Sequence, residues 1–156
     1  MLIVCMGNIC RSPTAEAVLR SALANAGLPI EVDSAGTANF HVGRPPDSRS
    51  IAHARRRGYE LGGLRARQVN AGDFLRFDLI LAADDTNLSV LRRLCPTEYR
   101  HKLSLFLGDR PLPDPYYGES EEFEKVLDLV EHRCAALVSA WGATAQSGGE
   151  QGEFVV

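Results

Sequence analysis

Apolar residues along the chain alternate between short continuous runs and stretches with helical spacing. Residues 2–4 form a continuous apolar run, typical of a strand buried on both faces, and further strands are predicted at 30–36, where the strand runs into a glycine-containing loop, at 77–84 and at 103–107. Between and after them, apolar positions three and four residues apart predict helices at 13–26, 45–58, 88–94 and 123–141. This order predicts a single α/β domain, a doubly wound sheet of four parallel strands with helices on both faces.

The ends of these elements carry their own local patterns. Ser12 and Pro13 are typical of a helix start, with Ser12 expected to cap it, and Gly27 is expected to end the same helix. The glycine-rich segment 145–156 predicts a loose tail, so the domain is expected to occupy residues 1–144.

Composition excludes several classes of protein. The 156 residues are 45% hydrophobic and 24% charged with a net charge of -3, which suggests neither a nucleic-acid nor a membrane partner. The short basic run at 54–57 is interpreted as a solvated helix face. No basic, apolar leader precedes the first strand, so the predicted location is the cytoplasm. The four cysteines are too sparse for a disulfide scaffold, and no pair has CxxC spacing: Cys5, Cys10, Cys95 and Cys134.

The segment "CMGNICRS" joins the first strand to the first helix and has the composition of an anion site. Such a loop directs backbone N–H groups and the positive end of a helix dipole at one point. Gly7 and Asn8 tolerate left-handed backbone angles, and Arg11 can contact two phosphate oxygens together. The same field favours the thiolate of Cys5, to which Ser12 can donate a hydrogen bond. We therefore expect phosphoryl transfer through a cysteinyl-phosphate, with the phosphate bound by the loop residues Met6, Gly7, Asn8, Ile9, Cys10 and Ser12.

A second candidate segment is "PLPDPYYGES". Expelling a phenolate at neutral pH requires a positioned acid, and Asp114 lies on this loop between two prolines. Tyr116 and Tyr117 are suited to stacking on an aromatic substrate. An ordinary turn, with the tyrosines half buried against the last helix, explains the same residues, and the pattern alone leaves both interpretations open.

Together these motifs resemble those of the low-molecular-weight protein tyrosine phosphatases. "VCMGNICRSPTAE", "DSAGT", "ARQV", "FDLILAAD" and "DPYYG" follow that family's order over roughly residues 2 to 142. The resemblance implies a flavodoxin-like fold and hydrolysis of phosphotyrosine in proteins, with no metal or other cofactor and with inorganic phosphate as product and inhibitor. It makes Cys5 the nucleophile, Arg11 the phosphate clamp and Asp114 the general acid and then base.

The resemblance also implies supporting roles. Ser34 would support Asn8, and Phe40, Tyr116 and Tyr117 would form the walls of an aromatic slot. Cys10 would trap oxidised Cys5 as a disulfide. Two positions depart from the family: Leu64 replaces a histidine that braces the loop asparagine, and Ala83 replaces a methionine. The histidines are expected to be surface residues rather than ligands: His41, His53, His101 and His132.

Three alternatives share this fold or chemistry. An arsenate reductase expects a close cysteine pair in the middle of the chain, where only Cys95 occurs. A protein-arginine phosphatase expects a threonine at the position of Ile9. A cysteine phosphocarrier has little use for a leaving-group acid such as Asp114.

Overall fold

A four-stranded parallel sheet forms the centre of the computed structural model, which describes residues 1–146. The strands are β1 (Leu2–Cys5), β2 (Asp33–Gly36), β3 (Ile80–Ala82) and β4 (Leu103–Leu105), in the order β2-β1-β3-β4. All three pairings are parallel, so the carboxyl ends of the strands lie at one edge. The predicted fold class is confirmed, although most strands are shorter than the segments predicted for them.

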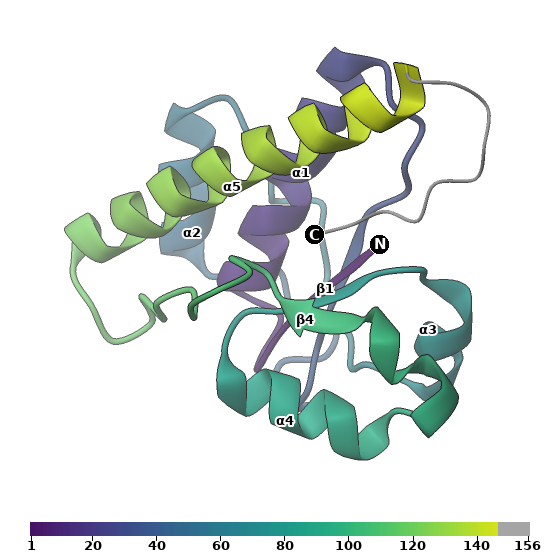
Figure 1. Cartoon of the computed structure of the whole chain (residues 1–156). Helices are drawn as coiled ribbons and strands as arrows, with labels where there is room; N and C mark the ends of the chain where they lie inside the picture. Colours follow the sequence, from purple (N-terminus) through teal and green to yellow (C-terminus); the bar gives the residue numbers. More distant parts are fainter. Residues whose placement is uncertain (147–156) are drawn as a thin grey trace.

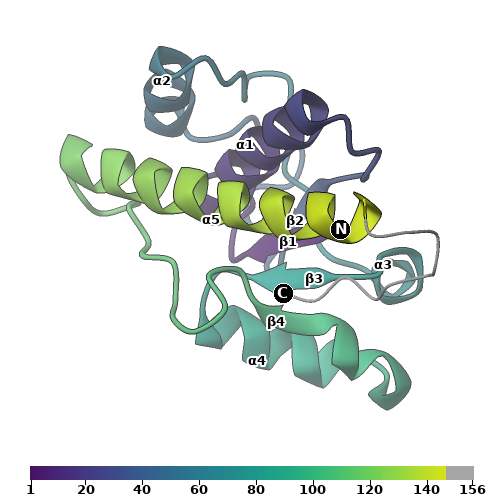
Figure 2. The same cartoon turned by 45° about the horizontal axis from the view of Figure 1, so that its top comes forward.

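Helices cover both faces of this sheet (Figures 1 and 2). One face carries α1 (Arg11–Ala26) and α5 (Ser120–Gln146), with α2 (Ser48–Arg56) packed against α5. The other face carries α3 (Ala71–Arg76) and α4 (Asp85–Leu94).

Alternation along β1 divides the hydrophobic core into two parts. Ile3 and Cys5 belong to the cluster beneath α1 and α5, whereas Leu2 and Val4 belong to the cluster beneath α3 and α4. Because successive side chains of a strand point to opposite faces, a strand buried on both sides must be apolar throughout. The last residue of β1, Cys5, therefore emerges on the α1 side of the carboxyl edge.

The boundaries of α1 differ from the prediction at one end. Gly27 ends the helix in the left-handed conformation, with a φ of 68°, as predicted. The N-cap, however, is Cys10, and Ser12 lies inside the first turn. The predicted cap by Ser12 is wrong because its hydroxyl contacts Cys5 instead of a helix amide.

At its C-terminal end, α5 is longer than its apolar spacing indicates. The helix continues to Gln146, so the domain boundary predicted at 144 falls within its last turn. The rest of the predicted tail, 147–156, lies outside the described residues. Among the helices that the structure describes, none combines the length and apolar character needed to cross a membrane.

The basic run in α2 is only partly a solvated face. Ala54 is buried, and Arg57 contacts Glu124, Asp128 and Glu131 on α5, with Arg57 Nη1 2.9 Å from Asp128 Oδ1. The predicted solvation of Arg57 is wrong because α5 presents three carboxylates to it. This ion pairing fixes the end of α2 against α5.

Candidate active site

Asn8 supplies the curvature of the loop between β1 and α1. It is the only residue other than glycine with a positive φ in the described chain, at 55°, so the predicted left-handed geometry is confirmed there. Gly7 lacks a positive φ, and that part of the prediction is wrong. Gly7 lies close to His41: a Cβ atom there would lie 2.9 Å from Cδ2 of that ring, so a larger residue would displace the His41 side chain.

Buried hydrogen bonds surround Cys5. Its Sγ lies 2.9 Å from Ser12 Oγ. Asn8 Nδ2 donates to Ser12 Oγ at 2.8 Å and to Ser34 Oγ at 2.9 Å, while Asn8 Oδ1 accepts from the backbone N–H of Arg67 at 3.0 Å. Both N–H bonds and the oxygen of the amide are therefore used, which fixes the loop at Asn8.

The two departures from the family pattern are accommodated differently. Leu64 packs against the core beneath α1, and Asn8 is held by Ser12, Ser34 and Arg67. Ala83 is buried, and its carbonyl accepts from the Leu112 N–H at 2.7 Å, which ties the segment leading to Asp114 to β3.

Arg11 is buried, and hydrogen bonds hold one edge of its guanidinium group. Its Nη1 donates to Asp84 Oδ2 and to the Leu112 carbonyl, each at 2.9 Å. Asp84 is also the N-cap of α4, where its Oδ1 accepts from Asn87 N–H at 2.9 Å. Nη2 of Arg11 lies 3.7 Å from Asp114 Oδ2. Asp84 is not among the residues predicted for the site, although its position just after β3, at the carboxyl edge of the sheet, indicates a place near a ligand.

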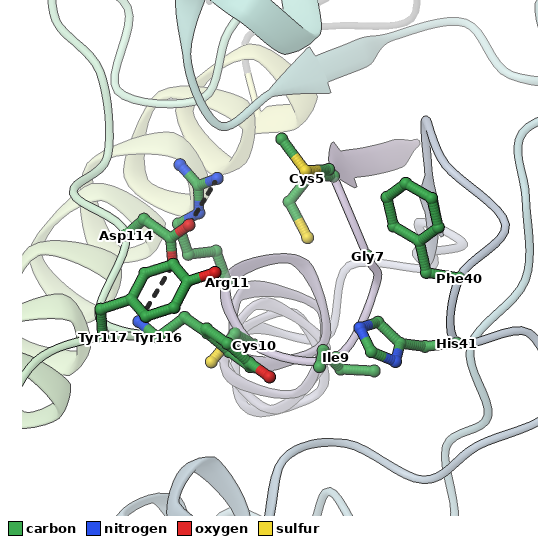
Figure 3. Close-up of a pocket in the computed structure, with 11 residues that line it drawn as sticks. Cys5, Gly7, Ile9, Cys10, Arg11, Phe40, His41, Asp114, Tyr116 and Tyr117 are labelled. Atoms are coloured by element: carbon green, nitrogen blue, oxygen red, sulfur yellow. Dashed lines mark hydrogen bonds and ion pairs between the residues drawn. The ribbon is translucent and has the colours of Figure 1, made fainter.

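A cavity of about 330 Å³ opens above Cys5 and Arg11. Figure 3 shows Phe40 and His41 on one side and Asp114 with the two tyrosines on the other. Cys10, Ile9, Gly7 and Met6 complete the lining. His41, predicted as a surface residue, is partly exposed and lines this cavity. The structure thus gathers both predicted motifs around one cavity large enough for a phenyl ring and a phosphate.

The loop that carries Asp114 is anchored to α2. Asp114 Oδ1 accepts from the Tyr116 N–H at 3.1 Å, and Arg49 Nη2 donates to the Tyr116 carbonyl at 2.9 Å. The Tyr116 and Tyr117 rings meet edge to face at 4.9 Å. Tyr117 is 94% exposed, so it is not the half-buried packing residue of the ordinary-turn interpretation.

His53 anchors the segment that follows. Its ring stacks on Phe123 at 5.5 Å, Nδ1 lies 2.7 Å from Glu124 Oε1, and Nε2 lies 3.2 Å from Ser120 Oγ. Hydrogen bonds from His53 and Arg57 lower the pKa of Glu124. The predicted surface position of His53 is wrong, because the start of α5 covers its ring.

The other three cysteines are buried, and of these Cys10 lines the cavity. Cys10 Sγ is 3.1 Å from Ser50 Oγ, and burial raises the pKa of Cys10 to about 12. Cys95 and Cys134 belong to the core clusters on opposite faces of the sheet. All four cysteines are free thiols. Across residues 1–146, no group of His, Cys, Asp and Glu side chains is arranged to hold a metal ion.

Comparison with known proteins agrees with this geometry. The family model described as low molecular weight phosphotyrosine protein phosphatase matches residues 1–147. The chain belongs to this family. The predicted enzyme class, a phosphatase, is thereby confirmed.

Individual relatives match over most of their length. The chain is 44% identical to the low molecular weight protein-tyrosine-phosphatase of Streptomyces coelicolor, over 88% of this chain and 90% of the relative. It is 37% identical to the human low molecular weight phosphotyrosine protein phosphatase, over 88% and 92% respectively. The crystal structure of such a phosphatase from Vibrio cholerae O395 superimposes with a TM-score of 0.87 at 38% identity, covering 92% of this chain and 96% of that one.

Proposed function

We propose that the chain hydrolyses phosphotyrosine in proteins through a cysteinyl-phosphate on Cys5. The observation that carries the proposal is the single cavity that holds Cys5 and Arg11 at its base and Asp114 at its wall. A nucleophile, a phosphate-binding guanidinium and a carboxyl acid within one cavity are the groups that phosphate-ester cleavage requires.

In the first step, Cys5 Sγ forms a bond to phosphorus while the bond from phosphorus to the phenolic oxygen breaks. Asp114 gives its proton to that oxygen, so tyrosine leaves as a neutral phenol. Arg11, held by Asp84 through Nη1, is positioned for the equatorial oxygens of the transferring group. The amides of residues 6–10 and the start of α1 support the remaining negative charge.

In the second step, Asp114 is a carboxylate and accepts a proton from water. The water oxygen attacks phosphorus, the bond to sulfur breaks, and inorganic phosphate leaves with the Cys5 thiolate restored. Because phosphate fits the same loop, we expect it to inhibit competitively.

Features of the walls favour an aromatic phosphate ester. Phe40, Tyr116 and Tyr117 line the same cavity as Cys5, so we expect a phenyl ring to stack on them and the arm of phosphoserine to lack that contact. Ile9 at the base favours this substrate over phosphoarginine. The separation of Cys95 and Cys134 onto opposite faces of the sheet argues against an arsenate reductase relay. Four free thiols suit a reducing compartment such as the cytoplasm.

Turnover of phosphotyrosine, phosphoserine and phosphoarginine peptides, and of arsenate with added thiol, should be measured on one purified sample. We expect the highest kcat/KM for the phosphotyrosine peptide, with Cys5→Ser as the background control. Faster turnover of phosphoarginine or arsenate, or activity that survives in Cys5→Ser, would contradict the proposal.

A further inference from the structure

Glu16 is a buried carboxylate that the proposed mechanism does not use. It lies on α1 one turn beyond Ser12 and is only 2% exposed. Its Oε1 accepts from Ser34 Oγ at 2.7 Å, and its Oε2 lies 2.9 Å from Arg20 Nη2. Burial raises the pKa of Glu16, and the hydrogen bond from Ser34 and the charge of Arg20 oppose that shift.

The hydrogen bonds around Glu16 lead to Cys5 without a gap. Glu16 accepts from Ser34, Ser34 accepts from Asn8, Asn8 also donates to Ser12, and Ser12 contacts the sulfur. The four successive distances are 2.7, 2.9, 2.8 and 2.9 Å, and each of these contacts is buried. Leu64 contributes no polar atom to this network, so the support behind Asn8 differs from the histidine of the family pattern.

A carboxylate only accepts hydrogen bonds, and this gives the network a direction. Ser34 has one proton and must direct it at Glu16, so its lone pairs face the amide nitrogen of Asn8. Asn8 then donates to Ser12 as well, and the single proton of Ser12 is left for the Cys5 sulfur. Were Asn8 reversed, Ser12 would donate to the amide oxygen and present lone pairs to the sulfur, which disfavours a thiolate.

We propose that Glu16 is a positioning residue that sets the direction of these hydrogen bonds and so stabilises the Cys5 thiolate. The inference rests on the proposed role of Cys5 as nucleophile. Arg67 N–H constrains the oxygen of Asn8, and Glu16 constrains its nitrogen. Without the carboxylate, the Ser34 hydroxyl is free to rotate and the second constraint is lost.

The test uses Glu16→Gln, which keeps the shape of the side chain and leaves one acceptor in place of two. Arg20, which can only donate, competes with Ser34 for the remaining oxygen. The rate at which iodoacetamide alkylates Cys5 should be followed by mass spectrometry from pH 6 to 9, together with kcat, KM and thermal melting. We expect alkylation at pH 6, the acid end of this range, to slow by up to about tenfold, the size of one lost hydrogen bond to a charged group, with the difference disappearing at high pH.

Three further variants separate this role from general effects. Ser34→Ala breaks the network with Glu16 intact and should slow alkylation similarly. At pH 6 the double variant should be slowed about as much as either single variant, rather than by the product of the two, because both changes remove one pathway. Arg20→Gln is the matched control: it removes the exposed partner but keeps the carboxylate, and alkylation should stay within about twofold of wild type.

The outcomes distinguish this role from the function itself. Wild-type alkylation kinetics in Glu16→Gln, a multiplicative double variant, or equal slowing in Arg20→Gln would overturn the role of Glu16. If Glu16→Gln fails to melt cooperatively, Ser34→Ala decides the matter: wild-type alkylation in that variant overturns the role. If wild type alkylates at Cys5 yet hydrolyses no phosphotyrosine, the proposed function fails, and the alkylation comparison still tests Glu16.

Discussion

Replacing Asp84 by asparagine should weaken both the fold and the chemistry, because this carboxylate serves two partners. Oδ2 accepts from Arg11 Nη1, and Oδ1 accepts from Asn87 N–H and from Asn87 Nδ2, each at 2.9 Å. An amide offers one acceptor oxygen. Asp84→Asn must therefore place an NH₂ group against the guanidinium or against the first turn of α4.

The magnitude follows from which contact is lost. If the amide keeps the α4 cap, the buried guanidinium loses a charge-assisted hydrogen bond of about 1.5–3 kcal/mol. If it turns to keep Arg11, the cap is lost at about 1 kcal/mol, and the guanidinium donates to a neutral amide oxygen in place of a carboxylate, which is a weaker bond. Either way we expect the free energy of unfolding to fall by about 2 kcal/mol, which lowers Tm by about 4–8 °C in a domain of this size. Loosened placement of Arg11 should lower kcat/KM on the order of tenfold to a hundredfold.

Thermal unfolding and steady-state kinetics on an aryl phosphate check both effects. Asp85→Asn is the matched control, because Asp85 is the next residue, is exposed, and also lies in the first turn of α4. That change should cost only a few tenths of a kcal/mol. If the two variants melt within about 1 °C of each other and retain equal kcat/KM, Asp84 does not hold Arg11 in the way that its contacts indicate.

Three other substitutions probe the nucleophile, the acid and the second loop cysteine. Cys5→Ser should abolish turnover but still bind phosphate, because the amides and Arg11 remain; calorimetry that finds no phosphate binding would contradict this. Asp114→Asn should lose activity in proportion to the pKa of the leaving group, since an amide keeps the shape and supplies no proton; a uniform loss across a series of aryl phosphates would assign the acid elsewhere. Peroxide should inactivate the enzyme reversibly with dithiothreitol, and Cys10→Ser should recover far less. Because burial raises the pKa of Cys10 to about 12, its thiolate fraction grows about tenfold per pH unit below that value. The ratio of Cys5–Cys10 disulfide to Cys5 sulfinic acid, measured by mass spectrometry, should therefore rise between pH 7 and 9, and a flat ratio would leave Cys10 as a packing residue.

The sequence was most informative where one local pattern determines one element. The apolar run at 2–4 and the spacing behind Pro13 predicted β1 and α1, and the glycine at 27 predicted where α1 ends. By contrast, α3 was missed because six residues are too few to show a helical period. The 3₁₀ helix at Thr97–Lys102 was missed because it has no buried residue and hence no apolar pattern.

Within the site, residues of one loop were predictable and contacts between distant segments were not. Cys5 and Arg11 share a loop, so their spacing could be interpreted directly. The contact of Asp84 with Arg11 joins residues 73 positions apart, and that of Ser34 with Glu16 joins residues 18 apart. A serine before a proline commonly caps a helix, so the local pattern predicts that role for Ser12. In the fold its hydroxyl contacts the Cys5 sulfur at 2.9 Å instead. Such choices depend on which partners the fold supplies.

The cavity draws its base and its walls from different parts of the chain. The base comes from one continuous segment, 5–11, held by buried hydrogen bonds, whereas the walls come from 40–41 and 114–117, where Phe40 is 71% exposed. A substitution at Phe40 or Tyr117 therefore changes the outline that a phosphorylated surface must match, and it removes little buried area from the core. Substrate selectivity can therefore change in evolution without a change in reactivity. Descendants of one such gene can acquire new substrates by altering exposed aromatic residues, while they inherit the nucleophile and its surroundings unchanged.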